Sequence, residues 1–287
     1  MPYGEKQDQS LRISVIVATR DRRDDVAECL VPLTGELLDR LGAEVIVLDD
    51  ASSDDTVGML AGRFPWVRVL VNPVNVGPGP ARNIAAAQAR GGLLVFIDSD
   101  AVPCEGWLET LAAADDGQTV LIGRVVDYKT GAVQYGPRRS TFLGKSLRCR
   151  PDRVNTGGAG NMAVPKHQFE SIGGFDPEIP NCFEDSWLCI RLGRAGARFR
   201  HLADAVVRHK GDTGKHGDEI RMQEHNSTYA MLKFYSDAPV WRLLFSVCNA
   251  IWMALRWTFW TFTARGVDAM LLWKGWITAH RRFAEME

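Results

Sequence analysis

The chain has 287 residues, 46% of them hydrophobic, so it is long enough to bury one large core or one core with an appendage. Its 34 Lys and Arg residues nearly balance 35 Asp and Glu, and the net charge of -1 gives no overall attraction to nucleic acid or acidic polymers. This composition excludes a disordered chain, and any bound anion must be held locally.

From residue 12 to residue 126 the chain alternates short β-branched runs with helical stretches. The expected strands are ISVIVAT (13–19), EVIVLDD (44–50), VRVLVN (67–72), LLVFID (93–98) and TVLIGRVV (119–126), and the expected helices are 23–40, 54–63 and 81–90. Runs this apolar suit strands that are covered on both faces. The pattern predicts a doubly wound, mostly parallel sheet with helices on both faces and ligands at the carboxyl ends of its strands.

The next part of the chain is less regular. Residues 127–160 are rich in Gly and Arg, and we expect them to form a long functional loop or a lid. NMAVPK (161–166) is expected to be a strand, EDSWLCIRLGRAG (184–196) a helix ended by glycine, and FRHLADAVVRHKG (199–211) a strand with its exit. The irregular stretch 211–222 is expected to close over a bound ligand.

Beyond residue 236 the composition changes to Trp, Phe and Leu with interspersed Arg, so we expect residues 1–236 to form the main domain and 237–287 an amphipathic helical appendage. The uncharged run between Arg242 and Arg256 has only thirteen residues, fewer than the roughly 18 to 20 that span a bilayer. These apolar stretches flanked by Arg suit helices in a membrane interface. A packed hairpin or a homodimer contact explains them equally, and both readings stay open.

Cysteine usage and the N-terminus indicate the compartment. Six cysteines occur without a CxxC pair, which predicts free thiols and no zinc site. The first ten residues, MPYGEKQDQS, lack the apolar core of a signal peptide. We therefore expect a cytoplasmic protein, with the C-terminal helices offering contact with the inner face of the membrane.

The segment LVFIDSD (94–100) places two aspartates at a strand end, where the pleat turns Asp98 and Asp100 to one side and Ser99 to the other. Two hard oxygen ligands at one spot suit Mg²⁺ or Mn²⁺ bridging to a phosphate, although a solvated turn or helix cap would explain the same pair. His209 ends the strand expected nearby and is a candidate third ligand, with a structural role equally plausible.

Two further motifs lie at the expected ligand edge of the sheet. Asp49 and Asp50 end a predicted strand, and Asp50 is the candidate for contact with a nucleotide base or ribose. NPVNVGPGPARN (72–83) precedes a helix, and there glycines such as Gly77 permit close backbone approach to a diphosphate while Arg82 adds positive charge. On its own the glycine-rich turn is a weak signal, because it matches neither common phosphate-binding pattern.

Glu184 and Asp185 open the expected helix 184–196. The helix dipole favours acidic residues at this end, which explains one of the two. Adjacent residues point about 100° apart on a helix, so the other can face a cleft. Asp185 is the candidate catalytic base.

Taken in order, these motifs resemble the inverting glycosyltransferases of family 2, which have the GT-A fold. The resemblance covers about residues 12–235. It is carried by ISVIVATRDR, LDDASSDDT, NVGPGPARN, FIDSD, GNMAVPKHQFESIGGFDPEI, EDSWLCIRLGRAG and AVVRHKG. More loosely, EHNSTYAMLKFYSDAPVWRLL (224–244) resembles the tail of members that work at the membrane on lipid-linked or envelope acceptors.

The resemblance implies that Thr19, Asp21 and Asp50 line the nucleotide pocket and that Arg82 and Asn83 lie near the base or diphosphate. It also implies that Asp98 and Asp100 form the metal and ribose DxD motif and that Asp185 is the base. Together with the candidates above, the expected nucleotide-sugar contacts are Thr19, Asp21, Asp50, Gly77, Arg82, Asn83, Asp98, Ser99 and Glu184. The expected metal ligands are Asp98, Asp100 and His209.

The sequence thus predicts a glycosyltransferase that uses a divalent cation to move a sugar, with inversion, from a nucleotide diphosphate to an acceptor hydroxyl on a small molecule, glycan or lipid. The resemblance makes uridine diphosphate the commonest carrier. One alternative is a sugar-nucleotide nucleotidyltransferase, although ATRDRRDD after the first strand is not the Gly-rich basic loop of such enzymes. Another is a non-catalytic nucleotide-binding membrane adaptor, which would need no base.

Overall fold

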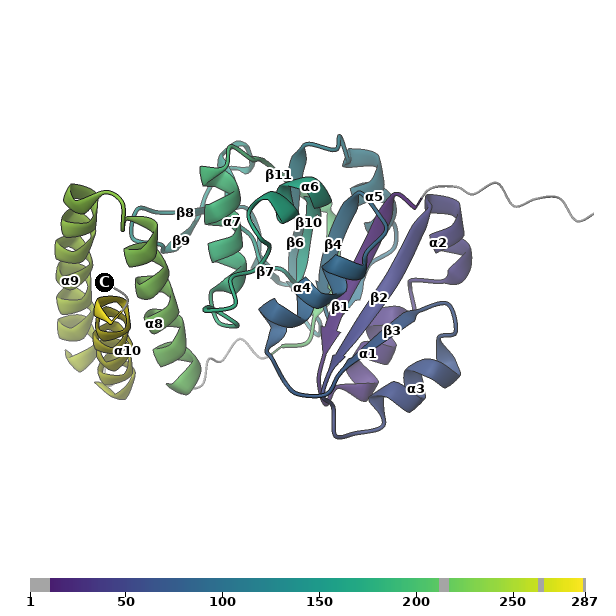
Figure 1. The fold of residues 1–287 in the computed structure, drawn as a ribbon, viewed down its shortest axis with the longest axis horizontal. Coiled ribbons are helices and arrows are strands. Elements are labelled where there is room, and N and C mark those ends of the chain that lie inside the picture. The colour runs from purple at the N-terminus through teal and green to yellow at the C-terminus, as the bar shows by residue number, and fades with distance from the viewer. Residues whose placement is uncertain (1–10, 212–216, 263–265, 286–287) are drawn as a thin grey trace, which may run out of the picture.

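A computed structural model describes residues 11–211, 217–262 and 266–285 of the chain. The first ten residues, and residues 212–216 of the expected closing segment, lie outside this part. Figure 1 shows a central sheet covered by helices and, at one end, a group of three helices formed by the last part of the chain.

The strands are β1 (Ile13–Thr19), β2 (Ala43–Asp50), β3 (Arg68–Asn72), β4 (Leu93–Asp98), β5 (Ala101–Pro103), β6 (Thr119–Asp127), β7 (Val133–Tyr135), β8 (Arg138–Ser140), β9 (Ser146–Arg148), β10 (Asn161–Pro165) and β11 (Arg198–His209). The helices are α1 (Arg23–Leu30), α2 (Gly35–Leu41), α3 (Thr56–Arg63), α4 (Pro78–Gln88), α5 (Trp107–Ala114), the 3₁₀ turn η1 (Pro151–Arg153), α6 (Lys166–Ser171), α7 (Glu184–Arg194), α8 (Gly217–Phe234), α9 (Pro239–Phe262) and α10 (Gly266–Ala284).

The main sheet has the order β3-β2-β1-β4-β10-β6-β11-β5, and β7 pairs with β6. Strands β3, β2, β1 and β4 are parallel, so their carboxyl ends meet at one edge. Strand β10 lies antiparallel between β4 and β6, and β6 is parallel to β11. The predicted doubly wound α/β class is confirmed, and β10 explains why the sheet is not parallel throughout.

Alternating side chains of the strands feed two separate cores, one on each face of the sheet. Val15 and Val17 of β1 pack with residues of α1, α2, α3 and α5, whereas Ile16 packs with residues of α4, α6 and α7. All three side chains are fully buried. This double burial is the reason why the strands read as continuous apolar runs.

Three predicted segments differ from the structure. The expected helix 23–40 is two helices, α1 and α2. A new helix begins after Thr34, whose hydroxyl caps α2 by accepting a hydrogen bond from the Leu37 amide. The loop 127–160 contains β7, the β8–β9 hairpin and η1. Residues 217–222, expected to be irregular, form the start of α8, and residues 212–216 of that segment lie outside the described residues.

The helical appendage after residue 236 is present as α9 and α10, and α8 packs with them. Tyr229 of α8, Phe245 of α9 and Ala279 of α10 share one buried cluster, which also includes Trp187 of α7. This cluster fixes the three helices against the main domain. Within residues 11–211, 217–262 and 266–285, no helix combines the length and apolar character required to span a bilayer.

Candidate active site

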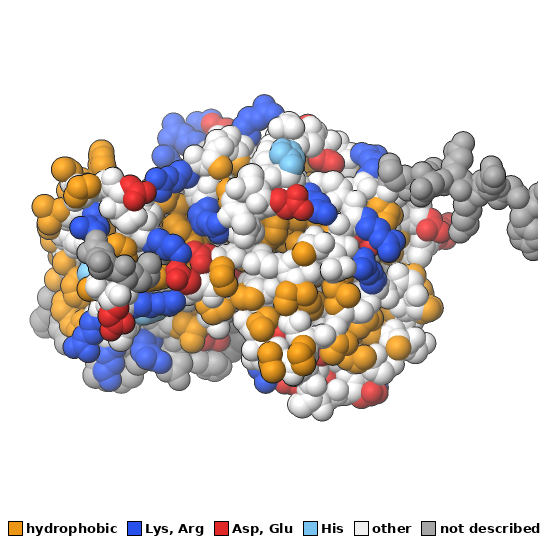
Figure 2. Space-filling model, viewed as in Figure 1, with side chains coloured by type: hydrophobic (Ala, Val, Ile, Leu, Met, Phe, Trp, Pro, Cys, Tyr) orange, Lys and Arg blue, Asp and Glu red, His pale blue; other side chains and the backbone are white. Residues whose placement is uncertain are grey.

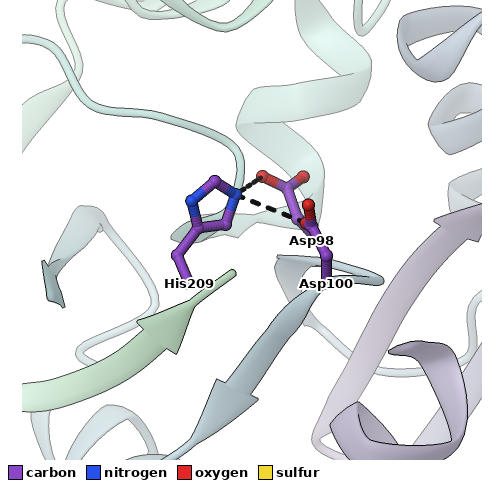
Figure 3. Close-up of side chains that lie close together, drawn as sticks. All are labelled: Asp98, Asp100 and His209. Carbon is purple, nitrogen blue, oxygen red and sulfur yellow. Dashed lines mark ion pairs between the residues drawn. The ribbon is translucent and has the colours of Figure 1, made fainter. Parts of the chain in front are cut away.

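The ends of β4 and β11 bring three predicted metal ligands together. Strand β11 pairs with β5, which begins just after Asp100, and this register sets His209 opposite Ala101. His209 Nε2 lies 3.3 Å from Asp100 Oδ1 and 3.9 Å from Asp98 Oδ2 (Figure 3). One ligand atom from each of the three residues lies within 4.8 Å of the others.

The chemistry of these donors fits a divalent cation. The His209 Nδ1 atom lies 3.2 Å from the amide oxygen of Gln134, which orients the ring so that Nε2 faces the carboxylates. The hydrogen bond to Asp100 raises the His209 pKa. The two carboxylates are oxygen ligands that suit Mg²⁺ and Mn²⁺, and the imidazole adds a nitrogen donor of the kind that transition metals accept.

Arg22, in the loop after β1, is a member of this group that the sequence motifs did not single out. Its guanidinium forms an ion pair with Asp100 Oδ2. Burial alone would raise the Asp100 pKa, but His209 and Arg22 together hold it well below its usual range. The signal in the sequence was the basic run RDRR directly after a strand whose carboxyl end lies at the same sheet edge.

Arg82 of α4 connects this cluster to the start of α7. Its side chain is buried, with Nη2 2.6 Å from Asp98 Oδ1 and Nη1 3.1 Å from Glu184 Oε1. Burial alone would lower the Arg82 pKa, but the charges of Asp98, Glu184 and Asp185 raise it above its usual value. The predicted convergence of the DSD and ED motifs is therefore present, with Arg82 between them.

The segment 158–160 passes close to both motifs. A Cβ atom at Gly160 would lie 2.4 Å from Asp98 Oδ2, and one at Gly158 would lie 3.4 Å from Asp185 Oδ2. A side chain at residue 160 would therefore displace the Asp98 carboxylate, which lies directly against the Gly160 backbone. Asp98 and Asp185 thus flank the same three-residue segment.

The two acidic residues at the start of α7 occupy different environments. Glu184 is buried and paired with Arg82, whereas Asp185 keeps partial exposure and accepts a hydrogen bond from the Ser186 amide at 2.5 Å. Burial raises the pKa of both, and the charge of Asp185 further raises the Glu184 pKa, to about 7. This difference matches the expected division into one structural carboxyl and one that faces a cleft.

A raised Glu184 pKa predicts a pH-dependent stability. A carboxyl whose pKa rises on folding contributes its stability at low pH and loses it as the pH rises through the folded value. From pH 4.5 to about 7 the free energy of unfolding of the wild type should fall relative to Glu184→Gln, on the order of 1 to 3 kcal/mol. Urea unfolding across this range measures the difference, and parallel curves for the two proteins would contradict the assignment.

At the carboxyl ends of β1 and β2, two buried polar atoms have no hydrogen-bond partner among the described residues. They are Thr19 Oγ1 and Asp49 Oδ2, and the two residues face each other in the strand register. The other Asp49 oxygen accepts from the Ser52 amide at 3.0 Å. Buried polar atoms are nearly always paired, so these two are available to a ligand.

Asp50, the predicted nucleotide contact, accepts hydrogen bonds from other parts of the chain. It is buried and accepts from Asn72 Nδ2 at 2.8 Å and from the backbone amides of Val76 and Gly77 at 3.1 and 2.9 Å. These bonds fix the loop between β3 and α4. Contact of Asp50 with a nucleotide base or ribose stays a prediction, and Asp49, in register with Thr19, is a second candidate.

Other predicted contacts also have partners within the chain. Asp21 is exposed and accepts from the Ser53 amide at 2.6 Å, the main reason why its pKa is lowered. Asn83 donates to the Phe175 carbonyl at 2.7 Å and accepts from the Phe175 amide at 2.8 Å. Ser99 is buried next to Asp98. Contact between these residues and a nucleotide sugar stays a prediction.

The close backbone approach expected at the glycine-rich turn is present, but its partner is another loop. The Gly79 amide donates to the Pro180 carbonyl at 3.0 Å, and a Cβ atom at Gly79 would lie 3.2 Å from that oxygen. Gly77 has a positive φ of 87° and also approaches Pro180. The turn thus holds the segment before α7, and contact of Gly77 with a diphosphate stays a prediction.

A parallel half-sheet followed by an antiparallel strand, with DSD and ED carboxylates beyond its carboxyl edge, is typical of the GT-A fold. The model of the family described as glycosyl transferase family 2 matches residues 14–169, and the chain belongs to this family. The resemblance seen in the sequence motifs is thereby confirmed.

Several known proteins that are similar to this chain are named as glycosyltransferases. The pre-mycofactocin glycosyltransferase of Mycobacterium tuberculosis is 29% identical over 216 residues, covering 69% of this chain and 42% of that protein. Glycosyltransferase AglE of Haloferax volcanii is 25% identical over 181 residues, covering 61% of this chain and 59% of that protein. The chain therefore spans about half the length of the curated relatives that it matches.

Solved structures share the fold at lower identity. Staphylococcus aureus TarS 1-349 in complex with UDP has a TM-score of 0.57 at 21% identity, covering 77% of this chain and 65% of that one. The mannosyltransferase PcManGT from Pyrobaculum calidifontis, in complex with GDP-Man and Mn²⁺, has a TM-score of 0.60 at 17% identity, covering 93% and 87%. These likenesses confirm the predicted GT-A fold.

Proposed function

We propose that this chain is a metal-dependent inverting glycosyltransferase that moves a sugar from a nucleotide diphosphate, in the first instance uridine diphosphate, to an acceptor hydroxyl. Its catalytic domain is residues 1–236, with 237–287 as a helical appendage. The observation that carries the proposal is the placement of Asp98, Asp100 and His209 in one cluster that Arg82 joins to the start of α7.

The cation would be held by Asp98, Asp100 and His209, whose donor atoms suit Mg²⁺ or Mn²⁺. When bound, it would supply positive charge to the leaving diphosphate. Because Arg22 also pairs with Asp100, its guanidinium lies close enough to assist in binding the same phosphates. The relative PcManGT is a solved example with a nucleotide sugar and Mn²⁺.

Asp185 is the proposed base. Its carboxylate accepts the proton of the acceptor hydroxyl while that oxygen forms a bond to the anomeric carbon and the bond to the diphosphate breaks. A single displacement of this kind inverts the anomeric configuration. Its raised pKa makes Asp185 a stronger base than an exposed aspartate, and the buried Arg82–Glu184 pair fixes the helix turn from which it projects.

The donor nucleotide would lie along the carboxyl edge of β1, β2 and β4. Thr19 Oγ1 and Asp49 Oδ2, both buried and unpaired among the described residues, are the groups that a base or ribose could satisfy. Asp50, Gly77 and Asn83 would complete the donor pocket, and their bonds within the chain hold them in place. The acceptor hydroxyl would approach from the side of Asp185.

The donor can be identified by thermal unfolding with a panel of uridine, guanosine and deoxythymidine diphosphate sugars. A donor at about 100 times its dissociation constant should add about 2.7 kcal/mol to stability with Mn²⁺ and much less with a chelator. We expect uridine diphosphate sugars to give the largest effect. Equal stabilisation with chelator would refute metal dependence, and pyrophosphate release from a nucleoside triphosphate would instead favour a nucleotidyltransferase.

A further inference from the structure

One face of α9 is apolar and exposed although the helix is firmly packed on its other side. Phe245, Asn249 and Met253 are buried against the neighbouring helices. The opposite residues, which we call the α9 stripe, are Val240, Trp241, Leu243, Leu244, Val247, Ile251, Trp252 and Leu255. Leu243 and Leu255 are 67% and 61% exposed, and Figure 2 shows hydrophobic side chains along this edge of the molecule.

A group of arginines adjoins one end of the stripe. The β8–β9 hairpin and η1 form a pocket of about 510 Å³ whose wall includes Arg139, Arg148, Arg150 and Arg153, all exposed. Phe142, in the turn of the hairpin, also lines this pocket, and its ring lies 6.1 Å from the ring of Trp241. The arginine pocket and the α9 stripe therefore form one continuous surface.

Positive charge predominates on this surface. Among the described residues, the ion pair found for these four arginines is Arg150 with the exposed Asp152, at 3.1 Å. Helix α9 contains no Asp or Glu from Pro239 to Phe262. The surface therefore combines apolar side chains for insertion with positive charge for attraction to phosphate.

We propose that the α9 stripe and the arginine pocket dock this chain onto a bilayer surface that contains anionic phospholipids. Helix α9 would lie along the interface with its stripe among the acyl chains, and the arginines would bind lipid phosphate groups. A contact between two copies through the same face explains the charges less well, because α9 offers no carboxylate that could pair with the arginines of the other copy. The proposal goes beyond the transfer reaction and does not depend on it.

Flotation of the full chain with vesicles tests the proposal, using phosphatidylcholine alone and an equal mixture with phosphatidylglycerol. We expect binding to the mixed vesicles that weakens with salt, and little binding to phosphatidylcholine. Replacing Arg139 and Arg148 by glutamine should weaken binding about 25-fold, since each arginine near an anionic surface contributes about fivefold. The matched control replaces the exposed Arg63 and Arg90 by glutamine and should bind like the wild type.

A second pair of variants tests the apolar part. Leu243→Ser with Leu255→Ser should weaken vesicle binding by about tenfold per side chain. The control changes two exposed valines outside α9, Val31→Ser and Val57→Ser, and should leave binding intact. Because all four positions are exposed, unfolding curves should stay close to those of the wild type.

Two results would overturn the proposal. One is equal flotation of the wild type and the stripe variant. The other is a wild-type dimer in light scattering that the stripe variant converts to a monomer, without vesicle binding by either, which would make the face a contact between copies. Binding of nucleotide sugar is measured on the same variants and should be unchanged, so failure of membrane docking is distinguishable from failure of the proposed transfer.

Discussion

Asp185→Asn should lower turnover by about 10² to 10⁴ while leaving donor affinity close to that of the wild type. The amide keeps the size of the side chain but cannot accept a proton from the acceptor hydroxyl. Donor binding should persist because the proposed metal ligands and the Thr19 and Asp49 groups are untouched. Steady-state transfer with the donor found in the panel, together with calorimetry for donor affinity, measures the two effects separately.

The control for this variant is Asp39→Asn, an exposed aspartate on α2 that should not alter turnover. The pH profile gives an independent check. Activity that depends on an ionised Asp185 should fall as the pH drops through the raised pKa of the acidic pair at the start of α7. Turnover of Asp185→Asn within a few-fold of the wild type would show that the base lies elsewhere.

Arg82→Met should destabilise the fold by about 3 to 5 kcal/mol, because it leaves the buried Glu184 and the half-buried Asp98 carboxylates without their partner. Arg82 contacts Asp98 and Glu184 and is itself buried, so water cannot replace the lost charge easily. Urea unfolding should show this loss with little change in the slope, and the exposed substitution Arg90→Met should change stability by less than about 0.5 kcal/mol.

A double variant distinguishes loss of the charge pair from loss of packing. Glu184→Gln removes the more buried of the two carboxylates that pair with Arg82, so Arg82→Met with Glu184→Gln should recover at least about 1 kcal/mol relative to Arg82→Met alone. A double variant no more stable than the single one would mean that Arg82 acts through packing, for example against the ring of Phe175, which lies 5.6 Å from its guanidinium carbon.

Much of the fold could be predicted because local patterns and burial agree. Strands such as β1 and β4 are covered on both faces, so each appears in the sequence as a continuous apolar run. The helical stretches between these runs predicted the crossover helices. The break between α1 and α2 was missed because Leu33 is buried in the same core as the helices, so apolar periodicity runs through it. The antiparallel direction of β10 depends on long-range pairing and has no local signature.

The site was predictable where residue types were chemically unusual for their position. Carboxylates at strand ends and at the start of a helix pointed to Asp98, Asp100 and Asp185, which the structure brings to one side of the sheet and whose roles stay predictions. The sequence could not distinguish the environments of Asp49 and Asp50. Only the structure shows that the backbone amides of the β3–α4 loop donate hydrogen bonds to Asp50. Arg22 and Gln134 were missed since both act through side-chain contacts with residues far away in sequence.

The central claim is that Asp98, Asp100 and His209 bind a cation next to the donor diphosphate. Calorimetric titration of UDP with and without Mn²⁺ tests this claim most directly. The wild type should bind UDP markedly better with Mn²⁺, and Asp100→Ala should lose that gain, lowering affinity by at least about tenfold. Unchanged UDP affinity of Asp100→Ala in the presence of Mn²⁺ would contradict the account.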